Sequence, residues 1–472
     1  MSTKHIFSIS TSRKRSLADT LTPIGIFLKI RKNFKNSVIL ESADYHGKEH
    51  GFSHIAFDPV ASFIINDQVV TQTFPNGESD TFRLDHPKEA ISALKSFADR
   101  FEFSAEAGDS PMANGLFGHI SYDAVSYFED IEIQAKNAET EIPSIRYYVY
   151  RYVIAINHFN NQMTAYAHSY DDQVASLETI DYLLEMPHYT LEPFQIMGEE
   201  ESNLSDDETR EIVETCIKHC LRGDVFQIVP SRRFSQRFKG DDFQVYRALR
   251  SVNPSPYLFY FDYENYRIFG ASPEKQIKIE GKIAEIHPIA GTFRRSGDDG
   301  KDAELALALI EDPKESAEHV MLVDLARNDL SRSANNVKVE TFKEVQFFSH
   351  VIHLVSKVTG TLQEGINPLQ LVADTFPAGT LSGAPKHNAM TIINRLEKTN
   401  RHIYGGAIGF MDFKGNFNHA IAIRTFLSKG NTLFFQAGMG VVAKSVVASE
   451  MQEIHNKLAA LRKALEVAQT LD

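Results

Sequence analysis

Several side chains in the second half of the sequence have the chemistry to bind an anionic molecule. Arg424, in Ile423-Arg424-Thr425, has a planar guanidinium that suits bidentate binding of a carboxylate. The glycines of Gly438-Met439-Gly440 lack side chains, so the backbone amides of this segment can approach a negative group closely. A Gly-x-Gly segment is also typical of a plain tight turn. These residues alone indicate an anion site only weakly.

Other polar residues have a structural interpretation beside a catalytic one. Glu453 precedes Lys457 by one helical turn, and such a pair stabilises a helix by roughly 0.2–0.5 kcal/mol. Glu274 follows a strand-like segment and could be an ordinary surface glutamate. His353 lies beside Leu354, where a histidine is more often a core residue with satisfied hydrogen bonds. Residue type alone leaves both interpretations open.

A series of short motifs occurs in a fixed order along the second half of the chain. The motifs are Gly223-Asp224-Val225-Phe226-Gln227, Gly270-Ala271-Ser272-Pro273-Glu274, Pro288-Ile289-Ala290-Gly291-Thr292, Met321-Leu322-Val323-Asp324-Leu325-Ala326-Arg327-Asn328-Asp329, Leu381-Ser382-Gly383-Ala384-Pro385-Lys386 and Tyr404-Gly405-Gly406. This series resembles the chorismate-binding enzymes over residues 205–465. Residues 20–170 more weakly resemble the N-terminal domain of the large subunits (component I) of anthranilate synthase. The resemblance implies conversion of chorismate and ammonia to anthranilate and pyruvate, the first step of tryptophan synthesis.

Ala290 distinguishes between members of the resembled family. The aminodeoxychorismate synthases have a lysine at this position that attacks the chorismate ring, so alanine implies that an external amine attacks instead. Aminodeoxychorismate synthase is therefore the alternative that Ala290 opposes. Isochorismate or salicylate synthase is a second alternative, opposed by the tryptophan-site motifs described below. A non-catalytic tryptophan-binding sensor is a third, opposed by the presence of the catalytic residues.

The resemblance also assigns roles to single residues. The C4 hydroxyl of chorismate leaves only when protonated, and Glu274 matches the general acid. His353 matches the histidine that acts in the elimination of pyruvate; His350 cannot share its face if the segment is a strand. Glu318 and Glu453 match ligands of Mg²⁺, a hard cation that prefers oxygen. The implied substrate contacts are Gly291, Thr292, Tyr404, Arg424, Gly438, Met439 and Gly440, with Thr292 also counted as catalytic.

Two further motifs resemble the walls of the tryptophan-inhibition site of that family. They are Leu40-Glu41-Ser42 and Asn253-Pro254-Ser255-Pro256-Tyr257-Leu258, although the second could be only a rigid turn. The implied L-tryptophan contacts are Ser42, Pro256, Tyr257 and Leu258.

Neither cysteine of the chain, Cys216 or Cys220, lies in a nucleophile-elbow context. The resemblance implies a separate glutamine amidotransferase subunit as the partner, in a hetero-oligomer.

The strands and helices expected around these residues indicate an α+β fold. We expect large mixed or antiparallel sheets in a sandwich-like core flanked by helices. Residues 1–200 are expected to form an N-terminal domain and residues 201–472 the catalytic domain, with a boundary in the polar stretch from Glu192 to Asp207. Asp312 and Pro313 predict the start of a helix that runs to about Leu330. Strands are predicted for Ala407 to Met411 and Phe417 to Thr425, and a final helix from about Val446 to Gln469.

Composition excludes several function classes. The 472 residues carry a formal net charge of -13, which disfavours nucleic acid as a partner. No apolar run approaches the roughly 18 residues of a membrane helix, and no apolar segment follows the basic residues Arg13 to Arg15 as in a secretion signal. The two cysteines have helical spacing, which fits a reducing compartment. We therefore expect a cytoplasmic protein.

Overall fold

Two long antiparallel strands, β3 (Phe52–Asn66) and β8 (Ile145–Asn157), belong to both large sheets of the protein. The computed structural model describes residues 5–42, 51–136, 139–186, 191–347 and 351–471. A register shift between Pro59 and Ala61 bends the pair, because a bulge in one strand increases the local twist. The first part of β3 therefore lies in one sheet and its last part in the other.

The first sheet combines strands from both halves of the sequence. From β3 its order is β2 (Val38–Glu41), β13 (Tyr257–Asp262), β14 (Tyr266–Ser272), β23 (Thr425–Lys429), β24 (Thr432–Gly438), β12 (Ser231–Gly240) and β10 (Phe194–Ser202). Beyond β8 follow β9 (Gln162–Tyr170), β1 (Phe7–Leu17) and β6 (Phe101–Glu102). All these pairs are antiparallel except β1 with β6.

The second sheet carries several of the predicted site residues. From β8 its order is β7 (Leu116–Ile120), β21 (Ala407–Met411), β22 (Phe417–Ile421), β15 (Lys275–Glu280), β16 (Ile283–Ile286) and β19 (Val351–Leu362), which also pairs with β17 (Ile289–Arg294) and β18 (Ala334–Phe347). On the other side of β3 lie β4 (Val69–Thr73) and β5 (Ser79–Arg83). A small separate sheet consists of β20 (Gly383–Ala384), β11 (Gln227–Ile228) and β25 (Val441–Val442).

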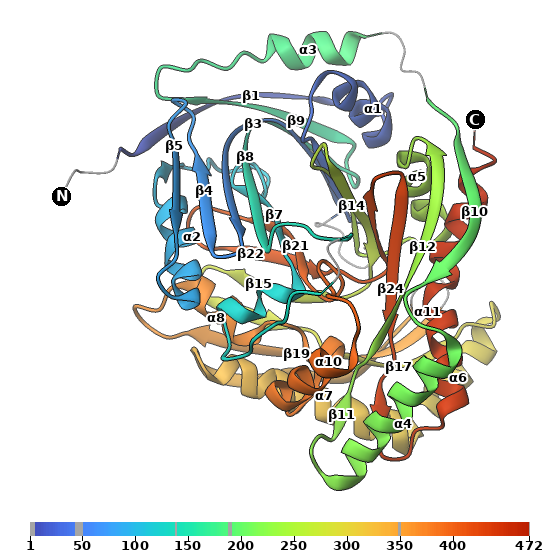
Figure 1. Ribbon diagram of the computed structural model, residues 1–472. Helices are drawn as coiled ribbons and strands as arrows, with labels where there is room; N and C mark the ends of the chain where they lie inside the picture. Colours follow the sequence, from blue (N-terminus) through green and yellow to red (C-terminus); the bar gives the residue numbers. More distant parts are fainter. Residues whose placement is uncertain (1–4, 43–50, 137–138, 187–190, 348–350, 472) are drawn as a thin grey trace.

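An apolar layer fills the space between the two sheets, for example Phe259 and Leu427 of the first sheet with Phe117 and Ile408 of the second. Helices cover the outer faces (Figure 1). The first sheet is covered by α1 (Pro23–Asn33), α3 (Glu178–Glu185), α4 (Asp206–Arg222), α5 (Phe243–Val252) and α11 (Val447–Ala468). The second is covered by α2 (Ala90–Ala98), η2 (Tyr122–Tyr127), α7 (Pro313–Ser331) and α8 (Pro368–Thr375). The remaining helices are η1 (Pro87–Glu89), α6 (Asp299–Glu311), α9 (Gly379–Ser382) and α10 (Lys386–Leu396). The sandwich flanked by helices confirms the α+β prediction.

The two predicted domains share both sheets. Strand β2 pairs with β13, and β7 pairs with β21, so strands from each side of residue 200 are neighbours. The polar stretch from Glu192 to Asp207, in which the domain boundary is predicted, contains the nine-residue strand β10. An edge strand gains backbone hydrogen bonds from β12 while most of its side chains remain in solvent, which explains its polar sequence. The division into residues 1–200 and 201–472 stays a prediction.

Local signals predicted several element ends correctly. The side chain of Asp312 caps α7 by accepting hydrogen bonds from the amides of Lys314 and Glu315, with Pro313 in the first turn. The final helix, α11, also has the predicted extent. The predicted strand from Phe417 to Thr425 is wrong near its end: β22 ends at Ile421, and Arg424, which has a left-handed backbone with φ of 50°, precedes β23. Within the described ranges, no helix is long and apolar enough to cross a membrane.

Candidate active site

Glu274 lies at the junction of β14 and β15, where its carboxyl group is withdrawn from water. Its backbone carbonyl accepts a hydrogen bond from Ile421 of β22, which fixes the junction against the second sheet. The hydroxyl of Thr380 donates to Glu274 Oε1 at 3.0 Å. Burial raises the pKa of Glu274 to about 7, against the opposing effects of the Thr380 hydrogen bond and the positive charge of Lys457. A carboxyl group that is half protonated near neutral pH can donate a proton to a leaving group.

His353 faces β17 from the neighbouring strand β19. In the strand register it lies opposite Thr292, and its Nδ1 is 2.9 Å from the carbonyl oxygen of Gly291. A carbonyl can only accept, so Nδ1 carries the hydrogen and the neutral ring keeps its lone pair on Nε2. Burial lowers the pKa of His353, and the nearby Arg424 charge lowers it further. His353 is thus held as a neutral base, while His350 lies outside the described residues.

The segment Ala290-Gly291-Thr292 forms a bulge in β17. Gly291 has φ of 71°, and a Cβ atom there would lie 2.9 Å from Leu309 Cδ1, so glycine is needed at this position. The side chain of Ala290 is buried, and the residue lies opposite Leu354 of β19. The bulge brings the Gly291 carbonyl to His353 and leaves a small side chain beside it.

Arg424 and Tyr404 form the basic side of the site. Burial lowers the pKa of Arg424, while Tyr404 and Glu453 favour its charged form. Among the residues that the structure describes, no hydrogen bond or ion pair to the Arg424 guanidinium is found. A buried guanidinium without a partner is costly, so this position suits an anionic ligand. The lack of a protein partner among the described residues agrees with the sequence prediction that Arg424 contacts a carboxylate of the substrate.

The turn Gly438-Met439-Gly440 joins β24 to β25 beside these residues. The Gly438 amide donates to the Tyr404 hydroxyl, and the Met439 amide donates to the Pro230 carbonyl at 2.9 Å. A Cβ atom at Gly440 would lie 3.1 Å from Gln227 Nε2 and 3.8 Å from Glu318 Oε1. The turn therefore lies against Glu318, and its part in substrate binding stays a prediction.

Carboxylates from α7 and α11 lie close enough to affect one another. Glu318 accepts a hydrogen bond from Gln227 at 2.9 Å. Glu453 forms an ion pair with Lys457 at 2.7 Å, so the helix pair considered from the sequence does exist. Burial and the Glu453 carboxylate raise the pKa of Glu450 to about 7, and burial and Glu318 raise the pKa of Glu315. These shifts show a local excess of negative charge, which suits a cation.

The donor set is small for a metal held by protein alone. Within the described part of the chain, no group of three or more His, Cys, Asp or Glu side chains is arranged to hold a metal ion. Mg²⁺ commonly uses one or two carboxylates and completes its shell with water and substrate oxygens. Glu318 and Glu453 fit this pattern, and Glu453 is close enough to Arg424 to favour its charged form.

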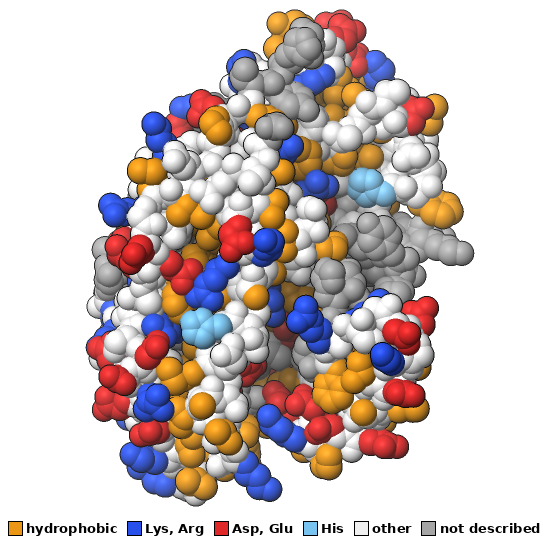
Figure 2. Space-filling model, turned by 90° about the vertical axis from the view of Figure 1, so that its right-hand side faces the viewer, with side chains coloured by type: hydrophobic (Ala, Val, Ile, Leu, Met, Phe, Trp, Pro, Cys, Tyr) orange, Lys and Arg blue, Asp and Glu red, His pale blue; other side chains and the backbone are white. Residues whose placement is uncertain are grey.

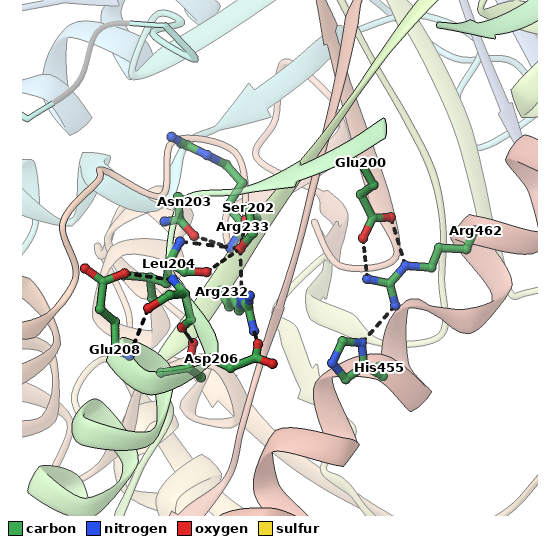
Figure 3. Close-up of polar contacts among 12 residues, drawn as sticks. Glu200, Ser202, Asn203, Leu204, Asp206, Glu208, Arg232, Arg233, His455 and Arg462 are labelled. Atoms are coloured by element: carbon green, nitrogen blue, oxygen red, sulfur yellow. Dashed lines mark hydrogen bonds and ion pairs between the residues drawn. The ribbon is translucent and has the colours of Figure 1, made fainter. Parts of the chain in front are cut away.

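Ion pairs outside the site fix the helix that carries Glu453. Arg462 of α11 binds both carboxylate oxygens of Glu200 on β10, at 2.7 and 2.9 Å, and also contacts His455 (Figure 3). Arg232 of β12 bonds to Asp206 at the start of α4. The face formed by α11 and β10 is hollowed in its lower half, and charged side chains gather at the rim of the hollow (Figure 2). The Glu200–Arg462 ion pair therefore ties α11 to β10, and the Arg232–Asp206 ion pair ties α4 to β12.

The two motifs assigned to an inhibitor meet on the first sheet, away from the bulge in β17. Strand β2 pairs with β13, which places Glu41 opposite Leu258. The buried Glu41 carboxylate accepts hydrogen bonds from Tyr246 at 2.8 Å and from Arg250 at 2.6 and 2.9 Å. Ser42 directly follows β2, Tyr257 is the first residue of β13, and both are partly exposed. The structure therefore brings the predicted walls together.

Some residues of the site had no role in the sequence prediction. Thr380, Gln227, Glu315 and Glu450 contact or electrostatically affect predicted site residues. The two glutamates lie three residues before Glu318 and Glu453, a spacing that places them on the same helix face. That signal could have been read from the sequence. The contacts of Thr380 and Gln227 join distant segments and leave no local pattern.

Comparison with known proteins agrees with this geometry. The family model for chorismate binding enzyme matches residues 40–463, and the chain belongs to this family. Anthranilate synthase component 1 from Aquifex aeolicus is 34% identical over 472 residues, covering 96% of this chain and 94% of that protein. The Mycobacterium tuberculosis component 1 is 36% identical over 487 residues, covering 97% and 93%.

Solved structures show the same relationship. Anthranilate synthase component I from Streptococcus pneumoniae is 32% identical, with a TM-score of 0.78, and the match covers 95% of this chain and 99% of that one. The menaquinone-specific isochorismate synthase from Escherichia coli has a TM-score of 0.72 at 17% identity, covering 98% and 96%. The second likeness shows a common fold alone.

Proposed function

We propose that the protein is the ammonia-using subunit of an anthranilate synthase, which forms anthranilate and pyruvate from chorismate. One observation carries the proposal: the site combines a protonatable Glu274, a neutral His353 held at the bulge of β17, and Arg424, close enough to His353 to lower its pKa and without a hydrogen bond or ion pair to its guanidinium among the described residues. An acid, a base and an anion site are the groups that this reaction needs. The similarity to proteins named anthranilate synthase component 1 supports the same conclusion.

Each residue has a defined part in the proposed reaction. Arg424 and Tyr404 hold the enolpyruvyl carboxylate. Ammonia adds to ring carbon C2 in the space beside Ala290, and the C4 hydroxyl leaves as water with a proton from Glu274. In the second step, His353 removes the C2 proton, the ether bond at C3 breaks, and the enol gains a proton to become pyruvate. The assignment follows the family resemblance at these positions, supported by the hydrogen bond between His353 and Gly291.

A divalent cation belongs to the proposal. Glu318 and Glu453 would hold Mg²⁺, since their oxygen donors and the local excess of negative charge suit a hard cation. The bound ion would supply positive charge to the ring carboxylate of chorismate. Gln227 would keep Glu318 turned toward this position.

The proposal is tested by incubating the purified protein with chorismate, Mg²⁺ and ammonium at alkaline pH and recording anthranilate fluorescence. We expect fluorescence that grows with time and requires all three additions. Glu274→Gln protein is the matched control, because it keeps the shape of the side chain and loses the proton. Absence of fluorescence with the wild-type protein, in the presence of folded protein by circular dichroism, would contradict the proposal.

His353→Met is expected to separate the two half-reactions. Amination does not need the histidine, whereas elimination does, so anthranilate formation should fall by about a hundredfold or more. Chromatography with mass detection should show an aminated product that keeps its pyruvyl group. His387→Met on the surface of α10 is the control and should behave as wild type. Anthranilate output that His353→Met leaves unchanged would exclude the role.

We further propose that tryptophan inhibits the protein at the place where β2 meets β13. Ser42→Phe should fill the pocket with its ring and raise the tryptophan concentration for half inhibition by about tenfold or more, without changing the uninhibited rate. The chain has 0 tryptophan residues, so added tryptophan can be followed by its own fluorescence. If the wild-type rate and the tryptophan emission do not change on mixing, the site is assigned wrongly.

The source of ammonia in this proposal is a separate glutamine amidotransferase subunit. Both cysteines of the chain are buried in α4, and burial raises the pKa of each thiol, so neither is suited to attack glutamine. The protein alone should therefore use ammonium but not glutamine.

A further inference from the structure

The hydroxyl of Thr380 is the one side-chain donor found on the Glu274 carboxyl group among the described residues. It lies 3.0 Å from Glu274 Oε1 and belongs to the short helix α9. No other hydrogen bond of the Thr380 hydroxyl is found in the described part of the chain. The two residues are 106 positions apart in the sequence.

The segment from α9 to the start of α10 is held in place by three contacts. Gly379 packs on Leu325 of α7 so closely that a Cβ atom would lie 2.1 Å from Leu325 Cδ2. Arg401 donates to the Leu381 carbonyl at 2.6 Å. At the end of the segment, Lys386 bonds to Asp329 of α7 at 2.7 Å. The Thr380 hydroxyl is therefore presented to Glu274 by a fixed backbone.

We propose that Thr380 is a positioning residue that sets the direction of proton transfer from Glu274. Because its hydroxyl donates to Oε1, that oxygen acts as the acceptor, and the transferable proton is carried by Oε2. The inference rests on the proposed function, in which Glu274 protonates the leaving hydroxyl group. Thr380 itself needs no contact with the reacting atoms.

The charges around Glu274 give the proposal a pH signature. Lys457 of α11 is the charged group that affects Glu274, while Thr380 of α9 is neutral. A hydrogen bond to the ionised carboxylate favours that form and lowers the pKa, so loss of the hydroxyl raises the pKa. A general acid is active when protonated, and its activity falls as the pH rises through the pKa. Without the Thr380 hydroxyl, the alkaline limb of the pH profile should move to higher pH.

Thr380→Val tests this proposal, because valine keeps the shape of threonine and lacks the hydroxyl. We expect kcat to fall by about tenfold to a hundredfold through lost orientation. The pKa that describes the alkaline limb of kcat/KM, measured at constant free ammonia, should increase by about 0.5–1 pH unit. Thr380→Ser should restore both values. Thr391→Val, which removes a hydroxyl that donates to the His387 carbonyl within α10, should change neither.

A second readout does not depend on turnover. The carboxyl carbon of Glu274, labelled with ¹³C and assigned with Glu274→Gln, reports its titration by NMR, with a wild-type midpoint near 7. The midpoint should rise in Thr380→Val. A lower kcat with an unchanged midpoint and limb would overturn the proposal in favour of a merely structural role, and so would wild-type values in every measurement. Wild-type protein that makes no anthranilate would refute the proposed function, whereas the titration would still decide whether Thr380 controls Glu274.

Discussion

Ala290→Lys is expected to abolish anthranilate formation, with a loss of at least about a hundredfold. The Ala290 side chain is buried beside the bulge at Gly291, next to the base His353. A lysine there would fill the space that ammonia needs with a long amine chain. Its own reactivity would depend on losing its proton in a dry site.

The Ala290→Lys variant is characterised by its activity, by comparison with Ala290→Ser, and by its intact mass. Anthranilate fluorescence gives the loss of activity, and Ala290→Ser, which stays small, should keep most of it. Intact-mass measurement after incubation with chorismate reports whether the new amine attacks the ring and forms an adduct. An absent adduct is compatible with simple steric exclusion. Anthranilate formed at the wild-type rate by Ala290→Lys would contradict the account, because ammonia could not then be using the space beside Ala290.

Glu318→Gln and Glu453→Gln are each expected to remove most Mg²⁺-dependent turnover. An amide has the same shape as the carboxylate but lacks the charge that a hard cation needs. Charge stabilisation by a metal is worth several kcal/mol, so a loss on the order of a hundredfold to a thousandfold is expected. Higher Mg²⁺ concentrations should recover part of the rate.

The control for this pair is Glu466→Gln, which removes a surface carboxylate that pairs with Lys463 on the same α11. It should retain wild-type turnover and wild-type Mg²⁺ dependence. Full activity of Glu318→Gln or Glu453→Gln would refute the metal assignment. Loss of the folded circular dichroism spectrum would instead assign the glutamate a structural role, such as the Glu453 ion pair with Lys457.

Features of the fold that depend on neighbouring residues were predictable from the sequence. The start of α7 follows from the Asp312 cap and Pro313, and the turn between β21 and β22 is closed by Asp412, whose side chain accepts from the amides of Lys414 and Asn416. Both devices act over a few residues, so their signals are local. The short motifs are also local, and their order along the chain was enough to predict the family.

Features that depend on distant partners were not predictable. Strand β10 is polar because it lies at a sheet edge, and only its pairing with β12 makes it a strand. The left-handed backbone of Arg424 interrupts a segment whose composition is typical of one strand. The pKa of Glu274 depends on burial and on Thr380, a residue more than a hundred positions away. Such properties arise from tertiary packing and have no signal in local sequence.

The central claim is that this chain joins external ammonia to chorismate and releases pyruvate. Mass spectrometry of the products formed from chorismate, Mg²⁺ and ¹⁵N-labelled ammonium tests it most directly. The account predicts anthranilate that carries one ¹⁵N atom, together with an equal amount of pyruvate, and neither product from Glu274→Gln at a comparable rate. Isochorismate, or an aminated product that retains its pyruvyl group as the end product of the wild-type protein, would contradict it.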